Sequence, residues 1–247
     1  MKRFLTILPL LSLIVISCHR EPIAEATVDL NPAYVGEYVR FTSYSTNTDY
    51  VEWNMDDGIT YSTPVVDHYF VDPGFYDVTL RAFGTKGGVS TAMIPMDVIG
   101  AELTVVVILW TDIEGGEDPG YLLPGAEVTL YPTFTDWENF TNGSETLYTD
   151  SDGECTFTGL SYQRYYVDVW EANHGNEELG YEDVGWIETP MLEGEYYWTF
   201  EAMVDYYPNG KKSATAADRT QRSLKSVPAG EKRTPGEIVT KVPRKRK

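Results

Sequence analysis

Short segments in which apolar and polar residues alternate recur along the chain, and they constrain its fold more than any other feature. Turn-forming sequences such as DG, DPG, GG and NG separate them, and no long stretch after the N-terminal segment keeps a helical period. The pattern predicts an all-β chain with half-buried strands rich in Tyr, Val, Thr and Trp. The clearest segments are EYVRFTSYS (37–45), YDVTLRAF (76–83), ELTVVVILW (102–110), AEVTLYPTF (126–134), YYVDVWEA (165–172) and YYWTFEAMV (196–204).

The N-terminus has the features of an export signal. Two cations precede an apolar run from Phe4 to Ile16, which is too short to cross a hydrocarbon core of roughly 30 Å as a stable helix. The sequence VISC ending at Cys18 resembles the bacterial lipobox. This resemblance implies an acylated Cys18 that anchors the chain to a membrane of the bacterial cell envelope, by expectation the outer membrane. An ordinary secretory signal with an incidental cysteine is the alternative.

A hairpin is predicted in VEWNMDDGITY (51–61). Val51, Trp53 and Met55 alternate inward, and Asp57-Gly58 supplies the positive φ angles of a tight turn. Together with VGEYVRFTSYS before it and VDHYFVDPGFYDVTLRAF after it, the segment resembles the PKD domain, an immunoglobulin-like β-sandwich. The resemblance implies that Trp53 packs between two sheets and that His68 lies on a strand.

A second unit begins after Gly100. A P-G-A-x-V-x-L strand from Pro124 to Leu130 and a T-x-x-D-G-x-x-x-F-x-x-L hairpin from Thr149 to Leu160 resemble the prealbumin-like or carboxypeptidase-regulatory-like β-sandwich. Cys155 lies in that hairpin and is expected to be a buried, inert thiol. The predicted organisation is a signal peptide (1–17), an anchor and linker (18–25), a PKD-like sandwich (26–99), a prealbumin-like sandwich (101–206) and a disordered basic tail (209–247).

Charge divides the chain into an acidic body and a basic tail. From Cys18 to Pro208 there are five basic and thirty-five acidic side chains, a net charge of -30. From Asn209 to Lys247 there are twelve basic and three acidic side chains, a net charge of +9. The body should repel nucleic acid, and the tail has the small, polar and charged composition of a disordered segment.

The sequence offers little support for catalysis. It has three histidines and no HExxH, paired CxxC, GxSxG or glycine-rich phosphate loop. Asp56, Asp57 and His68 lie close together in the sequence, but a turn and a strand account for all three. We therefore expect a protein that is not an enzyme.

Two acidic loops are candidate calcium sites, because calcium prefers several oxygen ligands. TDIEGGEDPG carries Asp112, Glu114, Glu117 and Asp118, and TDSDGE carries Asp150, Asp152 and Glu154. Each lacks a complete calcium-binding motif, and solvated turns are the alternative explanation for both.

Trp137 and Trp186 are the candidate ligand-binding residues, since they lie in segments without strict alternation and are expected to be exposed. Two functions stay open for a lipid-anchored envelope protein. One is a binding or adhesion module for an extracellular glycan or protein, which exposure of both tryptophans would favour. The other is a structural spacer or assembly subunit of an envelope complex, which their burial would favour.

Overall fold

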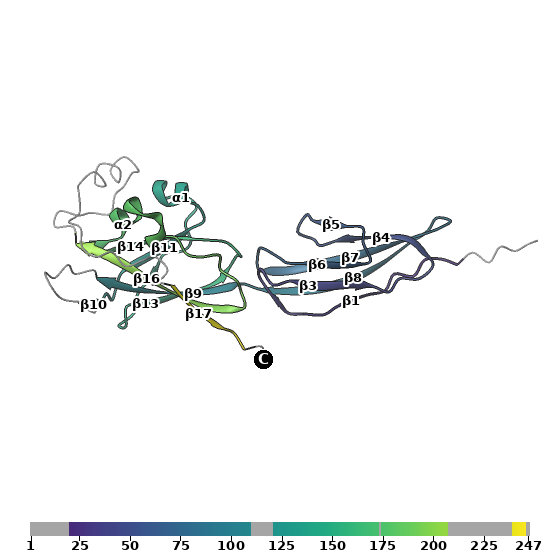
Figure 1. Cartoon of the computed structure of the whole chain (residues 1–247), viewed down its shortest axis with the longest axis horizontal. Helices are drawn as coiled ribbons and strands as arrows, with labels where there is room; N and C mark the ends of the chain where they lie inside the picture. Colours follow the sequence, from purple (N-terminus) through teal and green to yellow (C-terminus); the bar gives the residue numbers. More distant parts are fainter. Residues whose placement is uncertain (1–19, 110–120, 173, 207–238, 246–247) are drawn as a thin grey trace, which may run out of the picture.

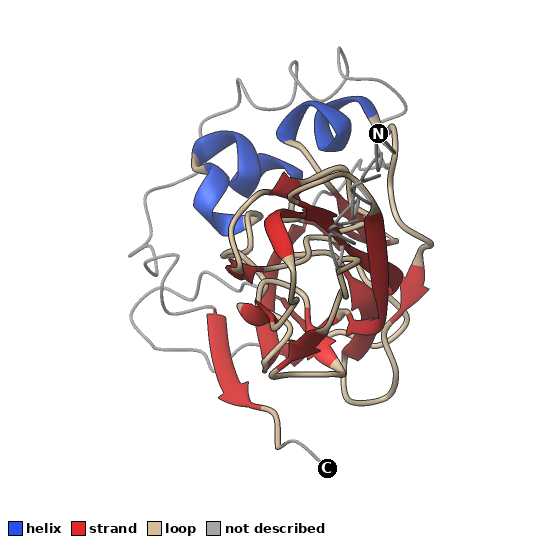
Figure 2. Ribbon diagram, turned by 90° about the vertical axis from the view of Figure 1, so that its right-hand side faces the viewer, coloured by secondary structure: helices blue, strands red, loops and turns tan. Residues whose placement is uncertain are grey.

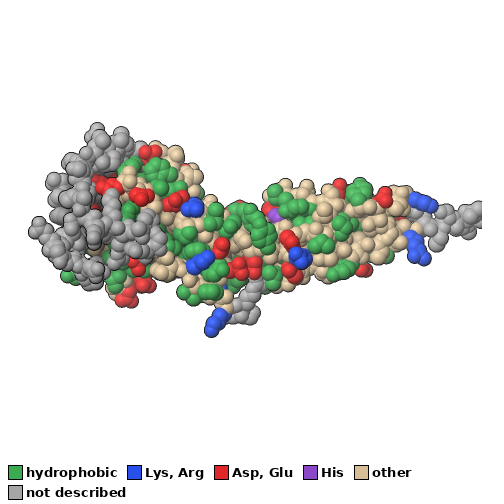
Figure 3. All heavy atoms as spheres, in the orientation of Figure 1, with side chains coloured by type: hydrophobic (Ala, Val, Ile, Leu, Met, Phe, Trp, Pro, Cys, Tyr) green, Lys and Arg blue, Asp and Glu red, His purple; other side chains and the backbone are tan. Residues whose placement is uncertain are grey.

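The computed structural model describes residues 20–109, 121–172, 174–206 and 239–245. They form an all-β chain of two consecutive β-sandwiches that lie end to end along the long axis of the molecule (Figure 1). On the face drawn in Figure 3, acidic side chains are more numerous than basic ones, in keeping with the charge of the body. No helix among the described residues is long and apolar enough to cross a membrane.

The first sandwich consists of two sheets, in which all strand pairs but one are antiparallel. The smaller sheet has the order β1 (Ala26–Val28), β3 (Val39–Ser43) and β6 (Val65–His68). The larger has the order β2 (Ala33–Tyr34), β8 (Val89–Ile99), β7 (Gly74–Gly84), β4 (Thr48–Asn54) and β5 (Thr60–Tyr61). β2 joins the edge of this sheet in a parallel pairing with β8. Apolar residues that alternate in the sequence point to the buried face of their strand: Val78, Leu80 and Ala82 of β7 are fully buried.

The predicted hairpin is confirmed, with one change in its turn. β4 and β5 pair antiparallel, with Trp53 opposite Tyr61. The residues with positive φ are Asp56 at 66° and Gly58 at 92°, so Asp56 and not Asp57 takes the left-handed conformation beside the glycine. Trp53 is 1% exposed, and its ring centroid lies 5.8 Å from that of Phe41 on the opposite sheet. The tryptophan therefore packs between the two sheets, as the PKD resemblance implied.

The second sandwich also has two sheets, which β16 connects. One sheet contains β10 (Tyr121–Leu122), β13 (Glu154–Leu160), β9 (Ala101–Leu109), β16 (Tyr196–Tyr206) and β17 (Val239–Pro243). The other contains β12 (Leu147–Tyr148), β11 (Glu127–Tyr131), β14 (Tyr166–Glu171) and β15 (His174–Gly175). β16 runs parallel to β9 in the first sheet, and its last residues pair with β15 of the second.

Three short helical segments, which the alternation pattern did not predict, accompany the second sandwich. They are α1 (Phe134–Asn139), α2 (Glu177–Glu182) and the 3-10 helix η1 (Val184–Trp186). Figure 2 shows the helices on one side of the strands. α1 begins after Thr133, whose side-chain oxygen accepts a hydrogen bond from the Asp136 N–H at 3.1 Å.

β17 corrects the prediction of a disordered tail from residue 209 to residue 247. Val239 to Pro243 form an antiparallel ladder with Phe200 to Tyr196 at the edge of β16. Residues 207–238 lie outside the described residues. The prediction is wrong for 239–243, because backbone pairing can order a segment whose side chains bury little apolar surface.

Candidate functional site

Trp137 and Trp186 do not form an exposed platform, and the expectation that they do is wrong. Trp137 is 0% exposed and Trp186 is 4% exposed. Trp137 lies in α1 and stacks on Phe134 with ring centroids 5.5 Å apart. The segments around both residues, which lack strict alternation in the sequence, form short helices that cover a sheet. Each tryptophan is the buried residue of its helix. Neither ring can stack on a ligand while it is buried in this way.

The loop of Asp150, Asp152 and Glu154 is organised as a turn. The Asp150 carboxylate accepts hydrogen bonds from the backbone N–H groups of Asp152 at 2.8 Å and Glu154 at 3.1 Å. Across the described part of the chain, no group of three or more His, Cys, Asp or Glu side chains is placed to hold a metal ion. The three carboxylates are thus not gathered as calcium ligands.

The other predicted calcium loop, with Asp112, Glu114, Glu117 and Asp118, lies outside the described residues. Cys18, the predicted lipidation site, lies outside them as well.

His68 is part of a short hydrogen-bonded chain that fastens the hairpin turn to β6. Its Nε2 lies 2.9 Å from Asp57 Oδ2, and its Nδ1 lies 3.1 Å from the Tyr61 hydroxyl. Burial lowers the pKa of His68, against the opposing effect of the Asp57 carboxylate. His68 is 5% exposed, so the ring is closed off from a substrate. The arrangement ties together the turn, β5 and β6, and its role is structural.

Cys155 is a buried thiol, as predicted. It is 8% exposed, and burial, together with the Asp150 charge, raises its pKa to about 12. At neutral pH the sulfur is therefore protonated and a poor nucleophile.

A shallow hollow of about 390 Å³ lies on the first sandwich, lined by Asp29, Tyr38, Arg40 and Asp67. Tyr38 is 65% exposed and contacts Tyr69 edge to face at a centroid distance of 5.1 Å. Arg40 donates to both carboxylate oxygens of Asp67, at 2.7 and 2.9 Å. The charged groups of Arg40 and Asp67 thus already bind each other.

The link between the sandwiches is a single residue. β8 ends at Ile99, β9 begins at Ala101, and Gly100 lies between them. A Cβ atom on Gly100 would lie 2.5 Å from the backbone of Gly159, so a larger residue cannot fit without moving the β13 strand. The chain therefore passes from one sandwich to the other without a flexible linker.

Backbone hydrogen bonds cross this joint at two further places. The Gly194 N–H donates to the Val35 carbonyl oxygen at 3.0 Å, and the Tyr162 N–H donates to the Val71 carbonyl oxygen at 2.7 Å. Loops of the second sandwich are thus held to the end of the first at points far from the covalent link.

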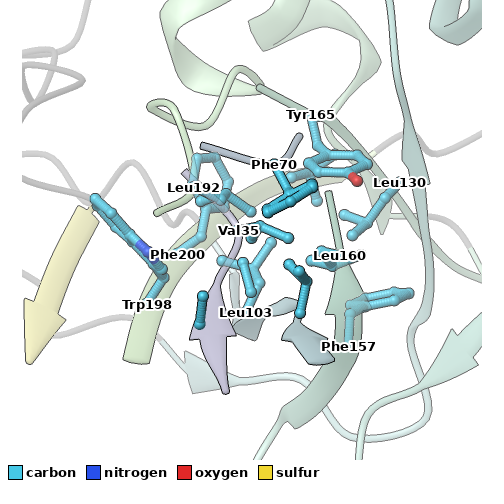
Figure 4. Packing of buried hydrophobic residues seen from close by; sticks show 14 of the residues in the cluster. Val35, Phe70, Leu103, Leu130, Phe157, Leu160, Tyr165, Leu192, Trp198 and Phe200 are labelled. Carbon is cyan, nitrogen blue, oxygen red and sulfur yellow. The ribbon is translucent and has the colours of Figure 1, made fainter. Parts of the chain in front are cut away.

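Side chains fill the joint. The Tyr162 ring covers Gly36, where an added Cβ atom would lie 2.4 Å from the ring. Val35 and Phe70 of the first sandwich belong to the same buried apolar cluster as Leu160 and Leu192 of the second (Figure 4). The cores of the two sandwiches are therefore continuous across the joint.

The C-terminal strand reaches the joint through Arg244. This side chain is 8% exposed and donates to the Gly100 carbonyl oxygen at 3.0 Å and to the Glu102 carboxylate at 3.1 Å. Its guanidinium carbon lies 5.4 Å from the ring centroid of Tyr34 and 4.9 Å from that of Tyr197. We call this set of partners the Arg244 cradle; it contains residues from both sandwiches.

Lys241 has a similar environment within the second sandwich. Its Nζ lies 4.3 Å from the ring centroid of Tyr196 and 5.1 Å from that of Trp198. The Glu193 carboxylate lies 3.5 Å from the same nitrogen. We call these partners the Lys241 cradle; in each cradle one basic side chain meets two aromatic rings and one glutamate.

Sequence reasoning missed the joint and both cradles. A signal for β17 is present, because IVTKV (238–242) is rich in β-branched residues. No comparable local signal marks the joint, since Arg244 and Gly100 are 144 residues apart.

Comparison with known proteins gives a family match over the first sandwich. The PKD domain family matches residues 19–98. No curated protein matches the chain.

Similar solved structures cover one or both sandwiches. The PKD1 domain of Vibrio anguillarum Epp is 20% identical, with a TM-score of 0.28 over 32% of this chain and 94% of that chain. A carbohydrate-binding module of the β-sandwich superfamily is 18% identical, with a TM-score of 0.31 over 57% of this chain and 85% of that chain. BcpA, the major pilin subunit of Bacillus cereus, is 11% identical, with a TM-score of 0.29 over 76% of this chain and 70% of that chain. All three TM-scores are low, so they carry no inference about function.

Proposed function

We propose that this protein is a non-catalytic structural module, a rigid two-sandwich spacer or assembly subunit of the bacterial cell envelope. The observation that carries the proposal is the joint, where one glycine links two sandwiches whose buried cores are continuous. A spacer must hold its two ends at a fixed separation, and this joint supplies that property.

Bending at the joint is costly for two reasons. It would break the hydrogen bonds from Gly194 to Val35 and from Tyr162 to Val71. It would also expose Val35 and Phe70, which are fully buried. Domains that share a small polar interface move relative to one another by default, whereas an apolar interface with a one-residue link opposes such motion.

The alternative, a binding or adhesion module, has lost its main support. Trp137 and Trp186 are buried, and burial was the outcome that favours the structural role. Glycan binding now depends on the hollow at Tyr38, where Arg40 and Asp67 already satisfy each other. We therefore favour the structural function.

Attachment to the membrane through Cys18 is part of the proposal, supported by the lipobox-like VISC sequence. We expect the wild-type chain to incorporate radiolabelled palmitate and to fractionate with membranes. Cys18→Ala should leave a soluble or uncleaved product without label, because acyl chains and not a membrane-spanning helix hold the protein. A wild-type chain that takes up no palmitate would contradict the lipid anchor.

Rigidity at the joint can be measured with spin labels on cysteines placed at Thr91 and Tyr148, one in each sandwich, in a Cys18→Ala background. Cys155 should escape labelling, because it is buried and its pKa is raised to about 12. We expect one narrow distance distribution for the parent chain. Inserting Gly-Ser-Gly-Ser after Gly100 should broaden it markedly, because the insertion separates the two ends of a joint that depends on close contact.

The matched control inserts the same four residues after Lys86, at the exposed turn between β7 and β8. This variant should keep the narrow distribution, because hairpin tips tolerate insertions. A broad distribution in the parent chain would show that the sandwiches move independently, and the spacer proposal would be wrong.

A further inference from the structure

We propose that the edge of β16 is an assembly site that accepts the C-terminal strand of a second copy of this chain. The site, called here the docking edge, consists of Tyr196–Phe200 with the Lys241 and Arg244 cradles. The same edge holds β17 of its own chain in this structure. The inference deepens the proposed structural role by naming the contact through which copies would join.

The docking edge is an open edge of the sheet once β17 is removed. Five residues of β17 pair with five residues of β16, and β17 pairs with no other strand among those described. Four of the five β17 residues are exposed, so the strand gains little from burial of its own side chains. Backbone pairing at a sheet edge is a general way to bind an extended segment from a separate chain.

The two cradles give the docking edge its specificity. Lys241 and Arg244 lie three positions apart, and each meets two rings and a glutamate. Arg244 is the stronger anchor, because its side chain is almost fully removed from solvent and bridges both sandwiches. Buried arginines and aromatic residues are typical of the positions that dominate binding free energy. An incoming strand must present a lysine and an arginine in this register.

The C-terminal segment of a second copy meets these requirements and can reach the site. Residues 207–238, thirty-two residues in all, connect β16 to β17. A chain of that length can span at most roughly 105 to 115 Å when fully extended. Release of β17 breaks no other strand pairing among the described residues. The tail carries +9 and the body -30, so the tail of either copy is attracted to a body, whether its own or that of a second copy.

Concentration decides between the two arrangements, because the contacts are identical whichever copy provides the strand. A tethered strand has an effective concentration on the order of millimolar. Dilute protein should therefore keep its own strand, and copies crowded together should exchange strands. Crowding is the condition that a membrane anchor at Cys18 would create, although the exchange itself needs no anchor.

Disulfide trapping distinguishes the two arrangements. Thr199 and Thr240 are paired across β16 and β17, and cross-strand pairs of this kind suit a disulfide. In a Cys18→Ala background, a chain with both Thr199→Cys and Thr240→Cys should form a disulfide between these two residues of the same chain on oxidation at low concentration. A mixture of the two single variants should give a covalent dimer, with a yield that rises as concentration approaches roughly 1 mM.

Arg244→Ala in the Thr240→Cys partner should lower the dimer yield about tenfold, as expected for a dominant anchor. Lys245→Ala is the matched control, because Lys245 carries the same charge but is exposed. It should leave the yield nearly unchanged. The proposal is overturned if the double variant closes but the mixture never forms a dimer, or if both substitutions reduce the yield equally.

If the double variant formed no disulfide within the chain, β17 would not pair with β16 as described, and the docking edge would not exist. None of these negative outcomes alters the spin-label distances across the joint, so the spacer proposal stands or falls separately.

Discussion

Replacing Trp53 with alanine is expected to lower the free energy of unfolding of the first sandwich by about 3 to 5 kcal/mol. The side chain is 1% exposed, and its ring contacts Phe41 across the sandwich. Its Nε1–H donates to the Thr63 carbonyl oxygen at 3.0 Å. The substitution leaves a large cavity between the sheets and an acceptor without its partner. Chemical denaturation followed by far-ultraviolet circular dichroism measures the loss.

Two turn substitutions serve as controls for Trp53→Ala. Gly58→Val should cost about 1 to 3 kcal/mol, entirely from its φ of 92°, since an added Cβ atom would meet nothing within 4 Å. Asp56→Ala should cost about 1 kcal/mol, because the Asp56 carboxylate accepts a hydrogen bond from the Asp77 N–H at 3.0 Å. A loss from Trp53→Ala smaller than either would contradict a core role for the tryptophan.

The strands and most of the first core were predictable because the information is local. Val78, Leu80 and Ala82 alternate in the sequence and lie inside the sandwich, as a period of two dictates. Trp137 shows the limit of this reasoning. Irregular sequence around it correctly excludes a strand, but it does not tell whether the segment is an open loop or a short helix folded over a sheet.

The tail and the joint escaped prediction for different reasons. Composition averages over residues 209–247, and that average conceals one short strand with two anchoring side chains. The joint depends on pairs that are distant in sequence, such as Ser161 Oγ and Asp72 Oδ1 at 2.6 Å. Neither residue is unusual in its own segment. A pattern of alternation indicates which face of a strand is buried, but not which element covers the end of a sandwich.

Trp137→Ala is expected to lower the free energy of unfolding of the second sandwich by about 3 to 5 kcal/mol, an effect similar to that of Trp53→Ala. Trp137 is 0% exposed and packs against Phe134 and Tyr181, with ring centroids 5.5 and 5.4 Å away. The indole fills the space between α1, α2 and the sheet, since an added Cβ atom on Gly180 would lie 3.0 Å from it. Removal should loosen the helices that cover this side of the sandwich.

Tyr148→Ala is the matched control for Trp137→Ala, because Tyr148 is an aromatic residue of the same sandwich that is 63% exposed. Its cost should stay within about 0.5 kcal/mol. Chemical denaturation of both variants, with a glycan array on each, separates packing from ligand binding. Suppose that Trp137→Ala kept the parent stability but lost a glycan that the parent and Tyr148→Ala both bind. The tryptophan would then be a ligand contact, and the preference for a structural function, which depends on its burial, would have to be reversed.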